Sequence, residues 1–75
     1  MQRRPDVHRF KVVRYIPHFG HGLIETLLGE HLTLEEAESL ADQHPPVSRE
    51  EEIVIRDETI MGLDGAIEIR SLEEH

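Results

Sequence analysis

The 75-residue sequence contains no cysteine and no tryptophan, and it has only three aromatic side chains. The lack of cysteine excludes both a disulfide framework and a metal site built from thiolates. A domain of this length buries only about 60% of its unfolded surface, so without a disulfide or a bound metal it is marginally stable alone. We therefore expect one domain over residues 1–75, whose small core would gain from self-association or from docking on a partner.

Long apolar runs are also missing. No stretch of the sequence approaches the roughly 20 residues that a membrane-spanning helix needs. The basic N-terminus is not followed by an apolar segment of the signal-peptide type. We expect a cytoplasmic protein with no membrane contact, and the single lysine beside seven arginines is typical of a GC-rich bacterial or phage genome.

Basic residues are scarce and concentrated at the N-terminus, within a net charge of −8. Residues 1–14 hold five basic residues and one acid, whereas residues 15–75 hold three arginines and fifteen acids. Nucleic-acid backbones bind clustered lysine and arginine, so this acidic body predicts no direct nucleic-acid contact. Residues 1–6 are expected to form a loose basic arm, and residues 73–75 a frayed tail.

The N-terminal half begins with a strand pattern. Residues 7–16 alternate with a period of two, which predicts a half-buried strand that ends at Pro17. Residues 17–22 contain two glycines and predict a turn. Residues 23–28 favour a returning strand with a bulge near Gly29, although their spacing also fits a short helix. One face of the first strand would carry Phe10, Val12 and Ile16, and the other Arg9, Lys11, Val13 and Tyr15.

A helix is predicted over residues 34–44. Thr33 is a good N-cap, and Glu36 three residues later completes a capping box. Apolar residues at helical spacing give the helix one buried stripe. Pro45 and Pro46 prevent its continuation.

Two more strands are expected after the helix. Residues 53–56 form a compact apolar run, and residues 66–72 alternate, with Ile67 and Ile69 inward and Glu68 and Arg70 outward. The Asp64-Gly65 dipeptide between them is typical of a hairpin turn. The order β-β-α-β-β predicts a small α+β fold, in which a mostly antiparallel four-stranded sheet carries the helix on one face.

No residue pattern of catalysis is present. None of the serines lies in a nucleophile motif, and no glycine-rich phosphate loop follows a strand. One helix on one small sheet leaves little room for a catalytic pocket of about 300 Å³. We therefore expect no catalytic residues, no cofactor and no enzymatic activity.

The leading hypothesis is a protein-interaction module that binds a protein partner or a second copy of itself. It would act through the sheet face opposite the helix, through a strand edge, or through an exposed loop at residues 58–63. The alternative for this loop is that the third strand continues to Met61 and buries part of it. The candidate binding residues are Val13, Tyr15, Val54, Ile60, Met61 and Leu63.

Two other functions fit the residues. A phage-type acidic inhibitor would mimic nucleic acid and block a basic channel with Glu35, Glu38, Glu50, Glu51 and Glu52, although the last three also fit a solvated linker. Alternatively, His18 and His21, three residues apart in the turn, would bind zinc or nickel, with His31, His8 or Glu30 completing the site. The six histidines of the chain are equally compatible with exposed polar positions.

Overall fold

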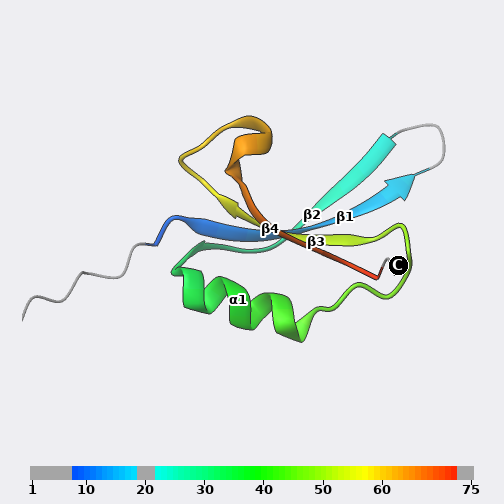
Figure 1. Cartoon of the computed structure of the whole chain (residues 1–75), viewed down its shortest axis with the longest axis horizontal. Coiled ribbons are helices and arrows are strands. Elements are labelled where there is room, and N and C mark those ends of the chain that lie inside the picture. The colour runs from blue at the N-terminus through cyan, green and yellow to red at the C-terminus, as the bar shows by residue number, and fades with distance from the viewer. Residues whose placement is uncertain (1–7, 19–21, 73–75) are drawn as a thin grey trace, which may run out of the picture.

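The computed structural model describes residues 8–18 and 22–72, so the predicted arm at residues 1–6 and the tail at residues 73–75 lie outside the described residues. The chain has the expected β-β-α-β-β order, with a short 3₁₀ helix before the last strand (Figure 1). The small α+β fold is thereby confirmed. Its elements are β1 (Phe10–His18), β2 (Gly22–Leu32), α1 (Leu34–Gln43), β3 (Glu52–Asp57), η1 (Gly62–Gly65) and β4 (Ala66–Ser71).

One antiparallel sheet contains all four strands, in the order β2-β1-β3-β4. The hairpins β1–β2 and β3–β4 are joined side by side through pairing of β1 with β3, from Phe10 opposite Asp57 to Tyr15 opposite Glu52. This leaves β2 and β4 as the two edges. The helix lies under one face of the sheet, and the connection between β3 and β4 rises on the other side (Figure 1).

The core lies between α1 and the sheet. Ala37 and Ala41 face the sheet and are fully buried, and their small side chains let the helix approach the strands closely. Partly buried leucines close the rim of this core. The buried strand residues that the helix covers are Phe10, Val12, Ile53 and Ile55.

The predicted capping box is present at the start of α1. The Thr33 hydroxyl accepts a hydrogen bond from the Glu36 N–H at 3.1 Å, and the Glu36 carboxylate accepts one from the Thr33 N–H at 2.9 Å. The helix ends at Gln43, one residue earlier than expected, ahead of the two prolines. Within the described part of the chain, no helix is long and apolar enough to cross a membrane.

The expectation that Pro17 ends the first strand is wrong. β1 continues to His18, with Pro17 opposite Leu23 and His18 opposite Gly22. Pairing with β3 has already stopped at Tyr15, so Pro17 lies where β1 has a free side. Proline is tolerated at such edge positions because no neighbour on the free side needs its missing N–H.

The second segment is a strand, as favoured, and it runs well beyond the predicted residues. Its pairing with β1 has two register shifts, between Phe10 and Val12 and between Val12 and Val13. Gly29 lies at this irregularity, and a Cβ there would come within 2.6 Å of a Leu40 methyl group. A side chain at position 29 would therefore push against the helix.

The inward and outward faces of β4 are the reverse of the prediction. Arg70 forms an ion pair with Asp42 of the helix and another with Glu68, which places both charged residues on the helix side. Ile69 lies opposite Val54 and remains 58% exposed. The alternation itself is correct, but α1 lies against β1, β2 and β3. The helix is therefore not placed to cover Ile69 and Ile67.

The capping box gives a first prediction. We expect Thr33→Ala to lower the free energy of unfolding by about 1 kcal/mol, because the Glu36 N–H loses its partner. For a domain of this size that corresponds to a fall in Tm of about 4–8 °C. Thermal unfolding followed by circular dichroism measures it, and Ser39→Ala, at an exposed position within the same helix, is the control. Equal Tm values for the two variants would contradict the role of the cap.

Candidate interaction surface

The sheet face away from the helix carries a row of four aliphatic side chains, one from each strand. Val13 of β1 lies opposite Leu27 of β2 and opposite Val54 of β3, and Val54 in turn lies opposite Ile69 of β4. Directly opposed residues in antiparallel strands share a face and lie about 5 Å apart. The four side chains therefore form one continuous apolar strip across the sheet, which we call the outer row.

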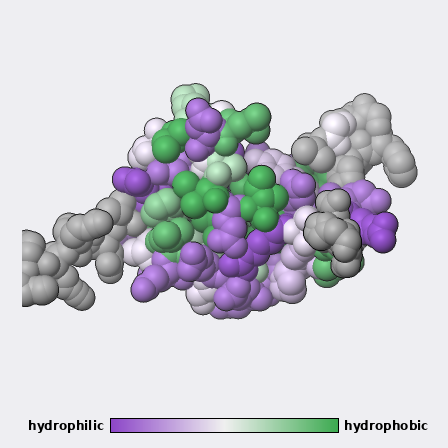
Figure 2. Space-filling view, viewed as in Figure 1, coloured by the Kyte–Doolittle hydropathy of each residue, from purple (hydrophilic) through white to green (hydrophobic). Residues whose placement is uncertain are grey.

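The two central side chains of the outer row are buried, and the two at its ends are exposed to solvent. Val13 and Val54 are 0% and 3% exposed, whereas Leu27 and Ile69 are 48% and 58% exposed. Hydrophobic residues gather across the middle of the molecule and on the connection above it (Figure 2). A face with this much uncovered aliphatic surface is typical of a site that another molecule covers.

Charged residues of opposite sign flank the outer row. On one side, Tyr15 lies between Glu25 and Glu52 in the register of the sheet. On the other side, Lys11 lies directly opposite Arg56. In the part of the chain that the structure describes, none of these four charged residues forms an ion pair. The outer row therefore has an acidic border and a basic border.

A groove of about 300 Å³ lies over β3 on this face. Val54, Tyr15 and Leu63 are among the residues that line it, and Leu63 is 90% exposed. The remaining lining residues are Glu52, Arg56, Ala66 and Ile69. The groove is thus mainly apolar and widens the outer row toward the connection between β3 and β4.

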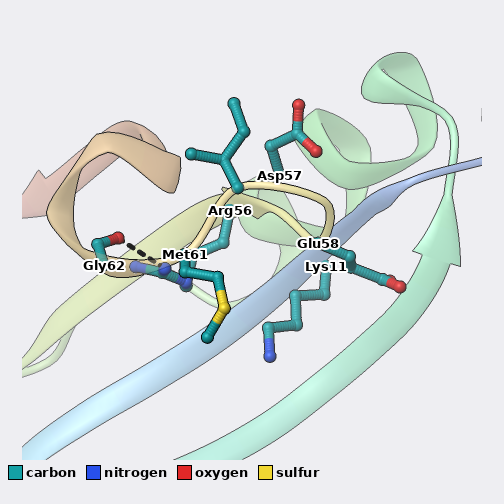
Figure 3. A pocket seen from close by; sticks show the side chains of 7 residues that line it. Lys11, Arg56, Asp57, Glu58, Met61 and Gly62 are labelled. Atoms are coloured by element: carbon teal, nitrogen blue, oxygen red, sulfur yellow. Dashed lines mark hydrogen bonds between the residues drawn. The ribbon is translucent and has the colours of Figure 1, made fainter.

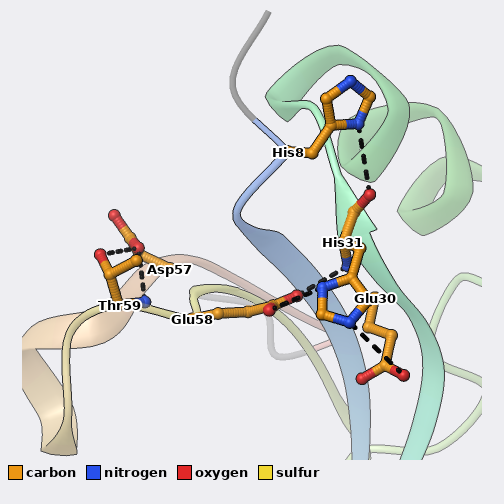
Figure 4. A network of polar contacts seen from close by, with 6 residues as sticks. All are labelled: His8, Glu30, His31, Asp57, Glu58 and Thr59. Carbon is orange, nitrogen blue, oxygen red and sulfur yellow. Dashed lines mark hydrogen bonds and ion pairs between the residues drawn. The ribbon is translucent and has the colours of Figure 1, made fainter.

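This connection begins with a tight turn at Asp57, where β3 ends (Figure 4). The Asp57 carboxylate accepts hydrogen bonds from the Thr59 N–H at 2.9 Å and from the Thr59 hydroxyl at 2.6 Å, and it forms an ion pair with Arg9 at 2.9 Å. The alternative that β3 continues to Met61 is therefore wrong. Ile60, Met61 and Leu63 are exposed, as the loop hypothesis requires.

The predicted Asp-Gly hairpin turn takes a different form. Asp64 and Gly65 belong to the 3₁₀ helix η1, and Gly65 has an ordinary backbone conformation. A Cβ at position 65 would collide with the Ile60 carbonyl oxygen, so this glycine is needed for close packing. The Asp-Gly pattern does not distinguish the two cases, because tight packing and a positive φ both favour glycine.

A second hollow, of about 250 Å³, lies beside Lys11 and Arg56 (Figure 3). The Arg56 guanidinium donates a hydrogen bond to the Gly62 carbonyl at 2.7 Å, which ties the connection to β3. The predicted binding residues Ile60 and Met61 line this hollow, away from the first groove. The two cations lie directly opposite each other, and Asp57 and Glu58 also line this hollow, so it contains charges of both signs.

The five acids of the inhibitor hypothesis do not form one surface. Glu51 is only 4% exposed; it accepts a hydrogen bond from the Val47 N–H at 2.6 Å and lies 3.5 Å from Arg14. It therefore holds the loop before β3 in place and is not part of an exposed face. Glu35 and Glu38 lie on the helix, on the opposite side of the sheet from Glu52.

The histidine pair of the metal hypothesis falls largely outside the described residues: His21 is not described, and of His18 only the backbone is. The Glu58 carboxylate accepts a hydrogen bond from the backbone N–H of His31 at 2.7 Å, and it lies 3.1 Å from the ring Nδ1 of His31 (Figure 4). His8 lies 3.4 Å from the His31 carbonyl. Among residues 8–18 and 22–72, no group of three or more histidine, aspartate or glutamate side chains is arranged to hold a metal ion.

The sequence-predicted residues Val13, Tyr15 and Val54 are brought together on the outer face, and Leu63 joins them through the groove. Sequence reasoning missed the two exposed ends of the row. Leu27 was hidden because two register shifts blur the period of β2, and Ile69 was placed on the wrong face. The alternation of β4 shows that Ile67 and Ile69 share one face, but it does not show which face of the strand the helix covers.

In comparisons with protein-family models, with curated protein sequences and with solved structures, no match to this chain was found.

The turn at Asp57 predicts a dependence of stability on pH. Hydrogen bonds from Thr59, with a smaller contribution from Arg9, lower the pKa of the Asp57 carboxyl below its ordinary value. A carboxyl whose pKa is lower in the folded state stabilises the fold above its ordinary pKa of about 3.9, and this stabilisation is lost as the pH falls through the folded-state pKa. We expect Asp57→Asn to be less stable than the wild type at pH 7 and closer to it at pH 3.

Urea unfolding at both pH values measures this difference. Asp64→Asn, at an exposed position in the same connection, is the control and should shift little at either pH. If Asp57→Asn and the wild type lose stability in parallel on acidification, the Asp57 turn does not make the expected contribution.

Proposed function

We propose that this protein is a non-catalytic protein-interaction module that binds a partner through the outer row and the groove beside it. The observation that carries the proposal is the unbroken line of Leu27, Val13, Val54 and Ile69 across all four strands. A sheet with a helix on one face needs apolar residues on that face only. The second apolar face is more than the fold requires.

The borders of the outer row indicate the chemistry of the partner. A segment lying across the strands would meet Glu25 and Glu52 along one flank and Lys11 and Arg56 along the other. The partner surface would therefore be an apolar ridge with basic residues on one side and acidic residues on the other. Such charge complementarity fixes orientation and rejects wrong partners more than it adds affinity.

The connection between β3 and β4 supports the same proposal. Leu63 stands beside the groove and Met61 beside the basic border, and both are almost fully exposed. A methionine in this position can adapt to a partner surface because its side chain is flexible and polarizable. The hydrogen bond from Arg56 to Gly62 holds this wall against the sheet, so little order has to be gained on binding.

The geometry of the two hollows favours binding over catalysis. Both are at or below the lower end of the size range of small-molecule sites. The buried carboxylate that lines the second hollow, Asp57, is already bound to Thr59 and Arg9. Its lowered pKa suits an ion pair, whereas a general base works best with a pKa near the operating pH.

The test is partner capture with matched variants. Leu27→Lys and Leu63→Lys place a charge on the row and on the groove wall, and Val47→Lys does so at an exposed site in the loop before β3. Proteins cross-linked to the wild type in cells are identified by mass spectrometry, and the affinity of the main partner is then measured by isothermal titration calorimetry. We expect Val47→Lys to bind like the wild type and the other two at least about tenfold more weakly, because burying one leucine contributes about 1.5–3 kcal/mol.

Equal binding by all four proteins would overturn the proposal. Titrations at low and moderate ionic strength separate it from the acidic-inhibitor alternative. Binding through the apolar row changes little with salt, whereas nucleic-acid mimicry predicts a steep loss of affinity.

A further inference from the structure

The two edges of the sheet differ in their readiness to pair with another strand. A free edge presents unpaired N–H and C=O groups, and proteins protect it with bulges, proline or covering segments. The β2 edge is interrupted by two register shifts and by His31 in a left-handed conformation with φ 57°. The β4 edge has one irregularity, opposite Arg56, and is regular from Glu68 to Ser71. Only β4 offers a regular free edge within the described chain.

The side chains of this edge are also unprotected. Ile67, Ile69 and Leu72 are all large, apolar and exposed. Apolar and charged residues alternate along the strand, since Glu68 and Arg70 lie between and after the two isoleucines. A regular free strand edge with an exposed isoleucine at its centre favours the addition of another strand.

We propose that β4 pairs antiparallel with β4 of a second copy of this chain, centred on Ile69, to form a continuous eight-stranded sheet. A two-fold axis perpendicular to the sheet then places Ile69 of one copy opposite Ile69 of the other. Glu68 lies opposite Arg70 of the second copy, and Arg70 lies opposite its Glu68. This inference concerns a strand edge and is independent of the partner that the outer face binds.

The charges of β4 select this register. A slip of one residue would turn every side chain to the other face of the sheet, so only registers centred on a residue are compatible with one continuous surface. Centring on Glu68 or on Arg70 would place like charges directly opposite each other, which is destabilising. Centring on Ile69 pairs unlike charges twice. The sequence Glu68-Ile69-Arg70 is therefore self-complementary in one register.

The dimer also accounts for the open end of the outer row. Ile69 is the most exposed member of the row and ends it at the β4 edge. In the dimer it meets its own counterpart, and the two rows join into one apolar strip of eight residues. Both helices lie on the same side, so the joined outer face stays accessible. A small domain with a marginal core gains the added burial.

The test uses charge reversal, with the association measured by analytical ultracentrifugation over a range of protein concentrations. The wild type is expected to form a dimer. Glu68→Arg places arginine opposite arginine in the proposed register, and Arg70→Glu places glutamate opposite glutamate. We expect the dissociation constant of each variant with itself to rise at least about tenfold, since two attractive pairs become repulsive.

Mixing the two variants restores the complementarity, because arginines at positions 68 and 70 of one chain then face glutamates of the other. The mixture should dimerise with an affinity within a few-fold of the wild type. This rescue also controls for folding, since Arg70→Glu loses its ion pair with Asp42 and a misfolded chain could not be rescued. Arg49→Glu, at an exposed position in the loop before β3, should leave the dimer unchanged.

A wild type that stays monomeric at the highest concentration would overturn the proposal, as would a dimer that both reversals leave intact. Leu27→Lys distinguishes these failures from that of the proposed function. It lies at the opposite end of the outer row, so it should weaken partner binding and leave the β4 dimer unaffected.

Discussion

The pairing of β1 with β3 is the contact on which the rest of the structure depends. Each of the two hairpins is local in sequence, and neither alone forms a sheet wide enough to support a helix. Alignment of Val12 with Ile55, and of Val13 with Val54, joins the hairpins and sets which residues face α1. The same alignment therefore produces both the core beneath the helix and the apolar row on the other face.

The single helix makes the two faces unequal. Ala37 and Ala41 allow α1 to lie closely against the middle of the sheet, and the helix covers one side only. On the other side, residues 8–18 and 22–72 provide no second layer, apart from the connection that carries Leu63 beside the groove. The apolar residues there are fixed by a rigid sheet and bordered by charges of both signs. The proposed binding function rests on this arrangement, which follows from having too few described elements to cover the sheet twice.

Local hydrogen bonds decide the details of this surface. Thr59 and Arg9 hold the carboxylate of Asp57, which stops β3 and turns the chain toward the outer face. Arg56 then holds the connection through the Gly62 carbonyl. At the opposite end of the sheet, β1 and β2 extend beyond β3, so the proline in β1 disturbs no third strand. The two ends of the sheet thus differ.

The sequence by itself determined the first, third and fourth strands and the helix, because strand periodicity and the capping box of Thr33 and Glu36 act over a few residues. It favoured a strand for residues 23–28 without excluding a helix, and it did not predict η1. It also placed Val13 and Tyr15 on one face of the first strand, since alternation in a regular strand is local. It could not decide which side of β4 faces the helix: alternation is symmetric, and the answer depends on how far α1 reaches across the sheet. Leu27 was hidden for a related reason, because the register shifts opposite Val12 exist only in the paired strands. The outer row was a property of the tertiary structure, since its four members meet only when residues far apart in the chain are brought into register.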